Sequence, residues 1–281
     1  MRMRASMVIC VALAATATFF GPSSAARAAG PMFSQAPAPA PEMVETCPGL
    51  VASKRLPVQR AQLKFDQVRI TYVGHSTFLI ESPQLVRIAT DYNDYVKPTI
   101  VPDIVTMNRA HSTHYTDRPE PSIAHVLRGW DEGESAARHD VHFKDVRVRN
   151  VPTNIRSWGG GTERHGNSVF IFELGNLCIA HLGHLHHTLT QQQLTEIGRV
   201  DIVLVPVDGS YTLDIEGMME VLQSLKAPMI IPMHYFSAYT LNNFLERARA
   251  LFEVETSDIP SVVVSKTTLP AKPKVLVLPG R

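Results

Sequence analysis

Three short apolar runs of this chain each lead into a loop that carries histidine. The run 103–107 (DIVTM) precedes NRAHSTH, the run 177–180 (LCIA) precedes HLGHLHH, and the run 229–232 (MIIP) precedes MHY. Apolar runs of this length are typical of fully buried strands. Loops at strand ends are where folds place functional side chains on a rigid base. The pattern therefore favours a fold that brings several histidine-bearing strand ends together.

The remaining apolar patterns predict two β-sheets with helices packed outside them. Short β-rich runs fill the first half of the chain, and buried strands alternate with segments of helical periodicity in the second half. This order is typical of the α/β class. With 281 residues, 44% of them hydrophobic, the chain can bury a sizeable core. Further strands are expected at 68–73, 77–81, 85–90, 146–151, 168–173 and 201–207, and helices at 190–197, 214–225 and 241–251.

The first residues have the pattern of an export signal. Arg2 and Arg4 precede an apolar run at 5–20, and residues 26–28 (ARA) supply the small residues that signal peptidase recognises. The alternative is a membrane anchor, but the strongly apolar part is shorter than the ~20 residues that a spanning helix needs. We expect a periplasmic or secreted protein that has left the membrane, with a signal peptide at 1–28, an Ala/Pro-rich linker and lead-in at 29–62, and one folded domain at 63–281.

Two cysteines, Cys47 and Cys178, remain after such a cleavage. An oxidising compartment permits a disulfide between them, and the alternative is two unpaired thiols, with Cys178 buried in a strand. Sequence leaves both readings open because it does not give the distance between the two Cα atoms.

The charge balance narrows the class of partner. Lysine and arginine number 27 and aspartate and glutamate 26, which gives a net charge of +1. A nucleic-acid-binding surface usually needs a basic excess, and none is present. We therefore expect a small-molecule substrate as the partner and no nucleic acid. The sequence does not indicate an oligomeric state.

The histidine loops indicate a metal site. Neutral imidazole is the commonest protein ligand for zinc, and three or four imidazoles suit its tetrahedral preference. The alternative is a polar loop without a metal. Isolated histidines, such as His125, His139 and His142, are expected at the surface or in loops.

Taken in order, the motifs resemble those of the metallo-β-lactamase-fold hydrolases. The resemblance spans about residues 68–235, and the branch it is most similar to is the ascorbate-6-phosphate-lactonase-like group. It implies a four-layer αββα sandwich whose one or two metals activate water for attack on an ester, lactone, amide or phosphodiester. The segments that carry it are ITYVGHSTFLIES, IATDYND, DIVTMNRAHSTH, HGNSVFIFE, AHLGHLHHTLT, VDIVLVPVDGSYTLD and IIPMHY.

The chain departs from that family at several metal ligands. The family's motif His-x-His-x-Asp-His aligns Arg109 with the first His, His111 with the second, Thr113 with the Asp and His114 with the last. The place of the family's metal-bridging aspartate is taken by His184. Arginine cannot ligate and repels a cation, and threonine removes a carboxylate. Too few ligands remain for two metals.

A single zinc or similar divalent ion is therefore expected, held by His114, His184 and His234, with His111 as a fourth candidate. A further histidine ligand of the family is missing where 155–156 (IR) stand.

Asp91 and Arg109 are the candidate catalytic residues. Asp91 is expected either to orient a ligand histidine or to act as a base, and its alternative is a turn residue. Arg109 is expected either to repel a metal or to bind a carboxylate or phosphate of the substrate. His75 is expected to line the pocket, or else to be a structural donor.

The function expected from these features is an exported metal-dependent hydrolase acting on an ester, lactone or phosphodiester. The alternative is a non-catalytic ligand- or partner-binding protein on the same fold, in which the loop histidines do not converge.

Overall fold

The computed structural model describes residues 62–130, 133, 135–157 and 159–280. The predicted signal peptide, nearly all of the linker and Cys47 lie outside these residues, so the expectations about them stay predictions. Cys178 forms no disulfide with any other described residue. No helix in the described part of the chain is long and apolar enough to cross a membrane.

The first sheet has six strands in the order β13-β1-β2-β3-β4-β5. Its first three strands in chain order are antiparallel neighbours, whereas β3, β4 and β5 run parallel. The strands are β1 (Gln67–Gly74), β2 (Thr77–Glu81), β3 (Arg87–Ala89), β4 (Ile104–Met107), β5 (His125–Arg128) and β13 (Ser261–Ser265).

The second sheet has eight strands in the order β12-β14-β11-β10-β9-β8-β7-β6. The strands from β6 to β9 are antiparallel, whereas β9, β10, β11, β14 and β12 run parallel. The strands are β6 (Asp140–Phe143), β7 (Val146–Arg156), β8 (Thr162–Leu174), β9 (Leu177–His181), β10 (Ile202–Pro206), β11 (Met229–Met233), β12 (Glu253–Thr256) and β14 (Lys274–Val277).

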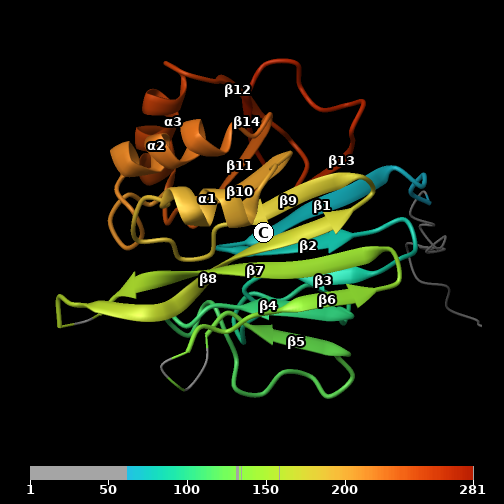
Figure 1. The fold of residues 1–281 in the computed structure, drawn as a ribbon. Helices are drawn as coiled ribbons and strands as arrows, with labels where there is room; N and C mark the ends of the chain where they lie inside the picture. The colour runs from blue at the N-terminus through green and yellow to red at the C-terminus, as the bar shows by residue number, and fades with distance from the viewer. Residues whose placement is uncertain (1–61, 131–132, 134, 158, 281) are drawn as a thin grey trace, which may run out of the picture. The chain divides into compact units, whose positions relative to one another are not determined.

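The two sheets pack face to face around one apolar core, to which Phe78 and Ile88 of the first sheet and Phe172 and Leu204 of the second contribute. Three helices cover the other face of the eight-stranded sheet (Figure 1) and bury a second apolar cluster there. They are α1 (Gln191–Ile197), α2 (Ile215–Leu225) and α3 (Ala238–Ala248). Among the described residues, loop side chains rather than a helix pack on the outer face of the six-stranded sheet.

Capping residues set where the helices begin. Thr190 forms a capping box at the start of α1, as its sequence predicts, and Asp214 accepts a hydrogen bond from the backbone N–H of Gly217 at the start of α2. The third helix begins at Ala238 rather than at Leu241, because Ser237 forms a second capping box.

The strand directions bring the histidine loops to one end of the sandwich. Because β9, β10 and β11 are parallel, the loops that follow them leave the same edge of the eight-stranded sheet. The loop after β4 and the turn between β1 and β2 reach this edge from the other sheet. A hydrogen bond of 2.7 Å from the backbone N–H of His234 to the carbonyl of His75 joins the two sheets there.

Candidate metal centre

Four imidazoles converge where these loops meet. His111, His114, His184 and His234 each offer one ring nitrogen, and these nitrogens all lie within 4.8 Å of one another. The Nε2 atoms of His111 and His184 are 3.0 Å apart, and those of His114 and His234 are 3.2 Å apart. His111 is half-buried and the other three are buried. The structure thus brings together all four residues predicted to be ligands, and metal binding by them stays a prediction.

The donor set fits one divalent ion. Zinc binds imidazole nitrogen at ~2.0–2.1 Å in a tetrahedron, which places neighbouring donors about 3.3 Å apart. The two Nε2–Nε2 separations, 3.0 and 3.2 Å, are close to this value. Facing imidazole lone pairs repel each other unless a proton or a cation lies between them. In the described residues, no other group of histidine, cysteine and carboxylate side chains converges in this way.

Asp208 fixes the orientation and tautomer of His234. Its Oδ1 accepts hydrogen bonds from the backbone N–H groups of Ser210, Tyr211 and Thr212, and its Oδ2 accepts one from the Thr212 hydroxyl. Burial acts to raise the pKa of Asp208, but the hydrogen bonds from His234 and Thr212 outweigh it and hold that pKa well below its usual range. Because this carboxylate only accepts, Nδ1 of His234, 2.9 Å from Oδ2, carries the hydrogen and Nε2 presents its lone pair to the cluster.

Asp91 lies against Nδ1 of His114, as Asp208 lies against Nδ1 of His234. Its Oδ2 lies 2.5 Å from Nδ1 of His114, and its Oδ1 accepts a hydrogen bond of 3.0 Å from the side chain of Asn108. Both members of the pair are fully buried. Burial raises the pKa of Asp91, and a bound cation nearby would favour its charged form. Asp91 therefore lies where it can orient a ligand, one of the two roles predicted for it.

The other two imidazoles have neutral partners. Nδ1 of His111 lies 2.7 Å from the hydroxyl of Thr113, which is in turn 3.0 Å from Nε2 of His75. Nδ1 of His184 lies 2.6 Å from Nε2 of His186. His75 thus contacts the cluster through Thr113, and the centre of its ring lies 4.2 Å from that of the tilted His234 ring.

Burial favours the neutral form of three of the four ligand candidates, and the neutral form of imidazole is the one that binds metals. Burial lowers the pKa of His111, and it lowers those of His114 and His184 well below the ordinary value of 6.5. Burial, with the charge of neighbouring histidines, also lowers the pKa of His75 to about 3. Burial followed by the nearby Arg156 charge lowers the pKa of His186 to about 4.

Three non-glycine residues of the site have unusual backbone angles. His75, Asp91 and His234 have φ angles of 50°, 41° and 55°, in the left-handed region that non-glycine residues rarely adopt. Gly183, directly before His184, has a φ of 60°, and a Cβ there would lie 2.4 Å from the side chains of Asn108 and Asn167. Such conformations persist only where the surroundings enforce them, so the loops hold these side chains in set directions.

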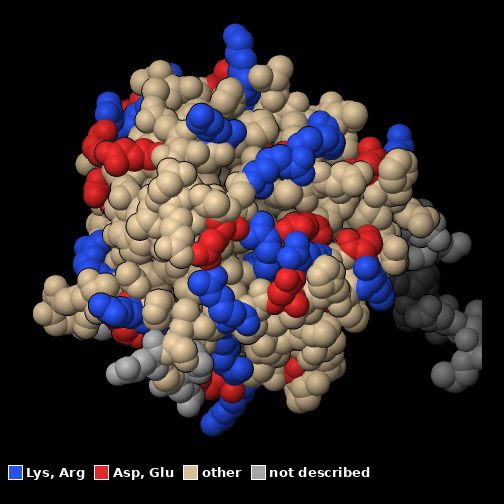
Figure 2. Space-filling view, in the orientation of Figure 1, with Lys and Arg blue, Asp and Glu red and all other residues tan. Residues whose placement is uncertain are grey.

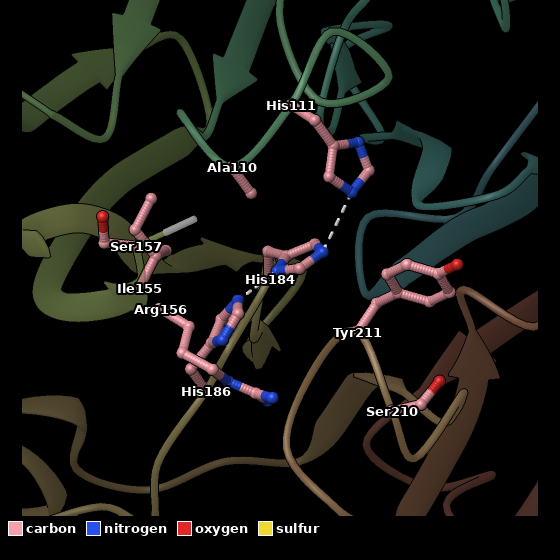
Figure 3. Close-up of a pocket in the computed structure, with 9 residues that line it drawn as sticks. All are labelled: Ala110, His111, Ile155, Arg156, Ser157, His184, His186, Ser210 and Tyr211. Atoms are coloured by element: carbon pink, nitrogen blue, oxygen red, sulfur yellow. Dashed lines mark hydrogen bonds between the residues drawn. The ribbon is translucent and has the colours of Figure 1, made fainter. Parts of the chain in front are cut away.

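A cavity of about 210 Å³ opens beside the cluster. Figure 3 shows His111, His184 and His186 linked along one wall, with the side chain of Arg156 beside His186. The lining residues are Ala110, His111, Ile155, Arg156, Ser157, His184, His186, Ser210 and Tyr211.

The structure does not bring the predicted residue Arg109 into this cavity. Its side chain is half-exposed and pairs with Glu163 at 3.4 Å, so its geometry gives no support to either role predicted for it. Arg156 supplies the cationic side chain instead. His187 points elsewhere, because its Nε2 accepts a hydrogen bond from the backbone of Asn154.

Sequence reasoning missed Asp208. A signal was present, since this aspartate follows the buried run 201–207 just as the ligand histidines follow theirs. Nothing in the sequence pairs it with His234, which lies in the next strand loop. Asp91 and Asp208, the carboxylates that the described part of the chain places near the cluster, both face histidine Nδ1 atoms, so neither is free to hold a second ion.

The family described as "Beta-lactamase superfamily domain" matches residues 69–234. Two similar proteins are the UPF0173 metal-dependent hydrolases of Thermoplasma acidophilum and Carboxydothermus hydrogenoformans. They are 25% and 26% identical over 207 and 211 residues. Each alignment covers 66% of this chain, and the two cover 91% and 93% of the respective relatives.

Solved structures agree with this match. A candidate Zn-dependent hydrolase of the metallo-β-lactamase superfamily from Thermotoga maritima has a TM-score of 0.56 and 28% identity, over 76% of this chain and 100% of that chain. Igni18, a metallo hydrolase from Ignicoccus hospitalis, shares the fold with a TM-score of 0.52 and 20% identity, over 76% of this chain and 97% of that one. The predicted α/β fold of the metallo-β-lactamase type is therefore confirmed, although in the described residues loops rather than helices form the outer layer on the six-stranded sheet. The lactonase-like branch stays a prediction.

Proposed function

We propose that this chain, which belongs to the β-lactamase superfamily, is a metal-dependent hydrolase with one divalent ion held by His111, His114, His184 and His234. The observation that carries the proposal is the convergence of four imidazoles, two of them backed by buried carboxylates. Support also comes from the relatives, which are described as metal-dependent hydrolases. In the alternative, a non-catalytic protein that binds a ligand or a partner, the loop histidines are expected not to converge.

Zinc is the ion we propose, because four nitrogen donors at these separations suit its tetrahedral preference. When bound, such an ion supplies Lewis-acid polarisation and activates water at neutral pH. The protein's part is to hold the donors, and Asp91 and Asp208 do so by accepting from Nδ1 of His114 and His234. The chain of His75, Thr113 and His111 is positioned to hold or pass a proton beside the cavity.

Esters, lactones and phosphodiesters are the substrates we propose. The cavity of about 210 Å³ lies below the ~300–1,000 Å³ of most ligand sites, which favours a small molecule. Figure 2 shows acidic and basic side chains intermixed on one face of the molecule, and this mixture supports the proposal that nucleic acid is not the partner.

Export to the periplasm or beyond is proposed from the segment 1–28 alone. Cell fractionation of the full chain, with N-terminal sequencing of the product, tests it. The expected product is outside the cytoplasm and starts after Ala28, whereas a full-length cytoplasmic product would contradict export.

Metal content tests the proposed function directly. The mature protein, expressed with zinc, manganese and iron supplied, is expected to bind about one equivalent of metal by elemental analysis. The double variant His184→Ala/His234→Ala is expected to bind none, because two of four donors are lost. The matched control is His187→Ala, in the same loop but bonded to Asn154 rather than to the cluster, which should keep its metal. A metal-free wild type would refute the proposal.

A further inference from the structure

We propose that the cavity beside the histidine cluster binds an anionic group of the substrate, a carboxylate or a phosphate, through Arg156 and His186. This rests on the proposed function and narrows its substrate class to small esters or lactones that carry such a group. Nothing in the proposed chemistry itself requires a charged substrate, so the two proposals can fail separately.

Arg156 is a cation on the cavity wall that is positioned by a hydrogen bond but forms no ion pair with the described residues. It ends β7, and one N–H of its Nη2 donates to the carbonyl of Thr212 at 2.8 Å, which fixes the guanidinium beside His186 (Figure 3). No carboxylate among the described residues pairs with it, in contrast to Arg109, which pairs with Glu163. The remaining N–H groups of a guanidinium form a fork that matches a carboxylate or phosphate.

His186 supplies a second donor. If neutral His184 binds the metal through Nε2, its hydrogen lies on Nδ1. This N–H group then donates to Nε2 of His186, which is 2.6 Å away. Neutral His186 must then carry its own hydrogen on Nδ1. That atom is buried and has no hydrogen-bond partner in the described part of the chain. A buried donor without an acceptor is costly, and because His186 lines the cavity, an anionic oxygen that reached this atom would satisfy it.

The charge of the other residues that line the cavity also favours an anion. Among the described residues, no aspartate or glutamate lines the cavity, whereas Ser157, Ser210 and Tyr211 add hydroxyl groups. The two nearby carboxylates, Asp91 and Asp208, lie behind the ligand imidazoles and are engaged there. Four neutral imidazoles would also leave the charge of a divalent ion uncancelled by its own ligands, which strengthens the attraction for an anion.

The test compares wild type with Arg156→Gln, Arg156→Lys and the matched control Arg109→Gln. Binding of inorganic phosphate and of monomethyl succinate is measured by equilibrium dialysis on the full chain, with and without one equivalent of zinc. Zinc content is read in parallel. At least one probe is expected to bind wild type, and the tighter one identifies the anion type. Arg156→Gln should weaken it roughly 10- to 100-fold, Arg156→Lys less, and Arg109→Gln not at all.

Hydrolysis supplies a second readout. For mono(4-nitrophenyl) succinate, Arg156→Gln should raise KM by the same roughly 10- to 100-fold, while KM for the uncharged methyl ester and the zinc content stay unchanged. The proposal is overturned if neither probe binds wild type at millimolar concentration, if Arg156→Gln leaves binding unchanged, or if Arg109→Gln causes the same loss. Absence of zinc from the wild-type protein would refute the proposed metal-dependent hydrolase. Phosphate dialysis on the metal-free chain would still show whether Arg156 binds an anion.

Discussion

The two halves of the histidine cluster are built differently. His114 and His234, the carboxylate-backed pair, are fully buried and each faces a buried aspartate through Nδ1. His111 and His184, the cavity pair, border the open space and face a hydroxyl and an imidazole through Nδ1. A carboxylate partner fixes the tautomer and raises the basicity of a ligand imidazole, whereas a hydroxyl or imidazole partner can donate or accept. The first pair is therefore suited to holding an ion, and the second to adjusting to substrate.

The largest expected effects on metal affinity and stability come from removing one ligand histidine from each pair. His234→Ala is expected to lower metal affinity by more than ~100-fold, beyond the usual effect of losing an outer partner. It should also destabilise the metal-free protein by about 1–3 kcal/mol, because the Asp208 carboxylate stays buried without one of its donors. His111→Ala, which leaves no carboxylate without a donor, should cost less in both measurements.

Metal affinity is read by competition with a chelator, and stability by urea unfolding without metal. Equal losses in the two variants would erase the proposed distinction between the pairs.

Asp208→Asn tests whether the carboxylate itself matters, and its expected effect is smaller. The amide nitrogen would face Nδ1 of His234 and favour the tautomer whose hydrogen points into the cluster. Metal affinity should fall by ~10–100-fold, the range for outer partners of metal ligands. Asp140→Asn, at an exposed aspartate paired with Arg147, is the control and should keep wild-type affinity. An unchanged affinity in Asp208→Asn would contradict the role given to the carboxylate.

Thr113→Val makes the corresponding change in the cavity pair and should have the smallest effect. It removes the hydroxyl between His111 and His75, and a neutral hydrogen bond contributes about 1 kcal/mol, or about fivefold in affinity. The same chelator competition measures it. A loss as large as that of Asp208→Asn would show that the hydroxyl partner is as important as the carboxylate.

Much of the fold could be predicted from periodicity, since the runs at 77–81, 177–181 and 229–233 are strands as expected. The strands β5, β6, β12, β13 and β14 were not predicted, because partly buried or exposed positions interrupt their short apolar runs and leave little periodicity. β13 pairs with β1, almost two hundred residues earlier in the chain, and no local pattern reports such a pairing.

The candidate site also contains residues that could be predicted from the sequence and residues that could not. The ligand candidates could be chosen from the sequence because histidine after a buried strand is a local signal. Asp91 was found through its motif and Asp208 was not, since the pairing of Asp208 with His234 depends on two neighbouring parallel strands. The sequence indicates Arg109 as a candidate for binding an anion and gives no such role to Arg156, because the direction of a side chain cannot be deduced from its position in a motif.

The order of residues along the chain is enough to say which residue types stand at the strand ends, and therefore to predict a nitrogen-rich donor set with arginine and threonine where the family has ligands. Three further features follow only from the folded arrangement: which imidazole nitrogen faces the centre, which carboxylate lies behind each ring and which arginine reaches the cavity. The physical reason is that residue type is local, whereas direction is set by strand register and by backbone angles such as the left-handed φ of His75, Asp91 and His234.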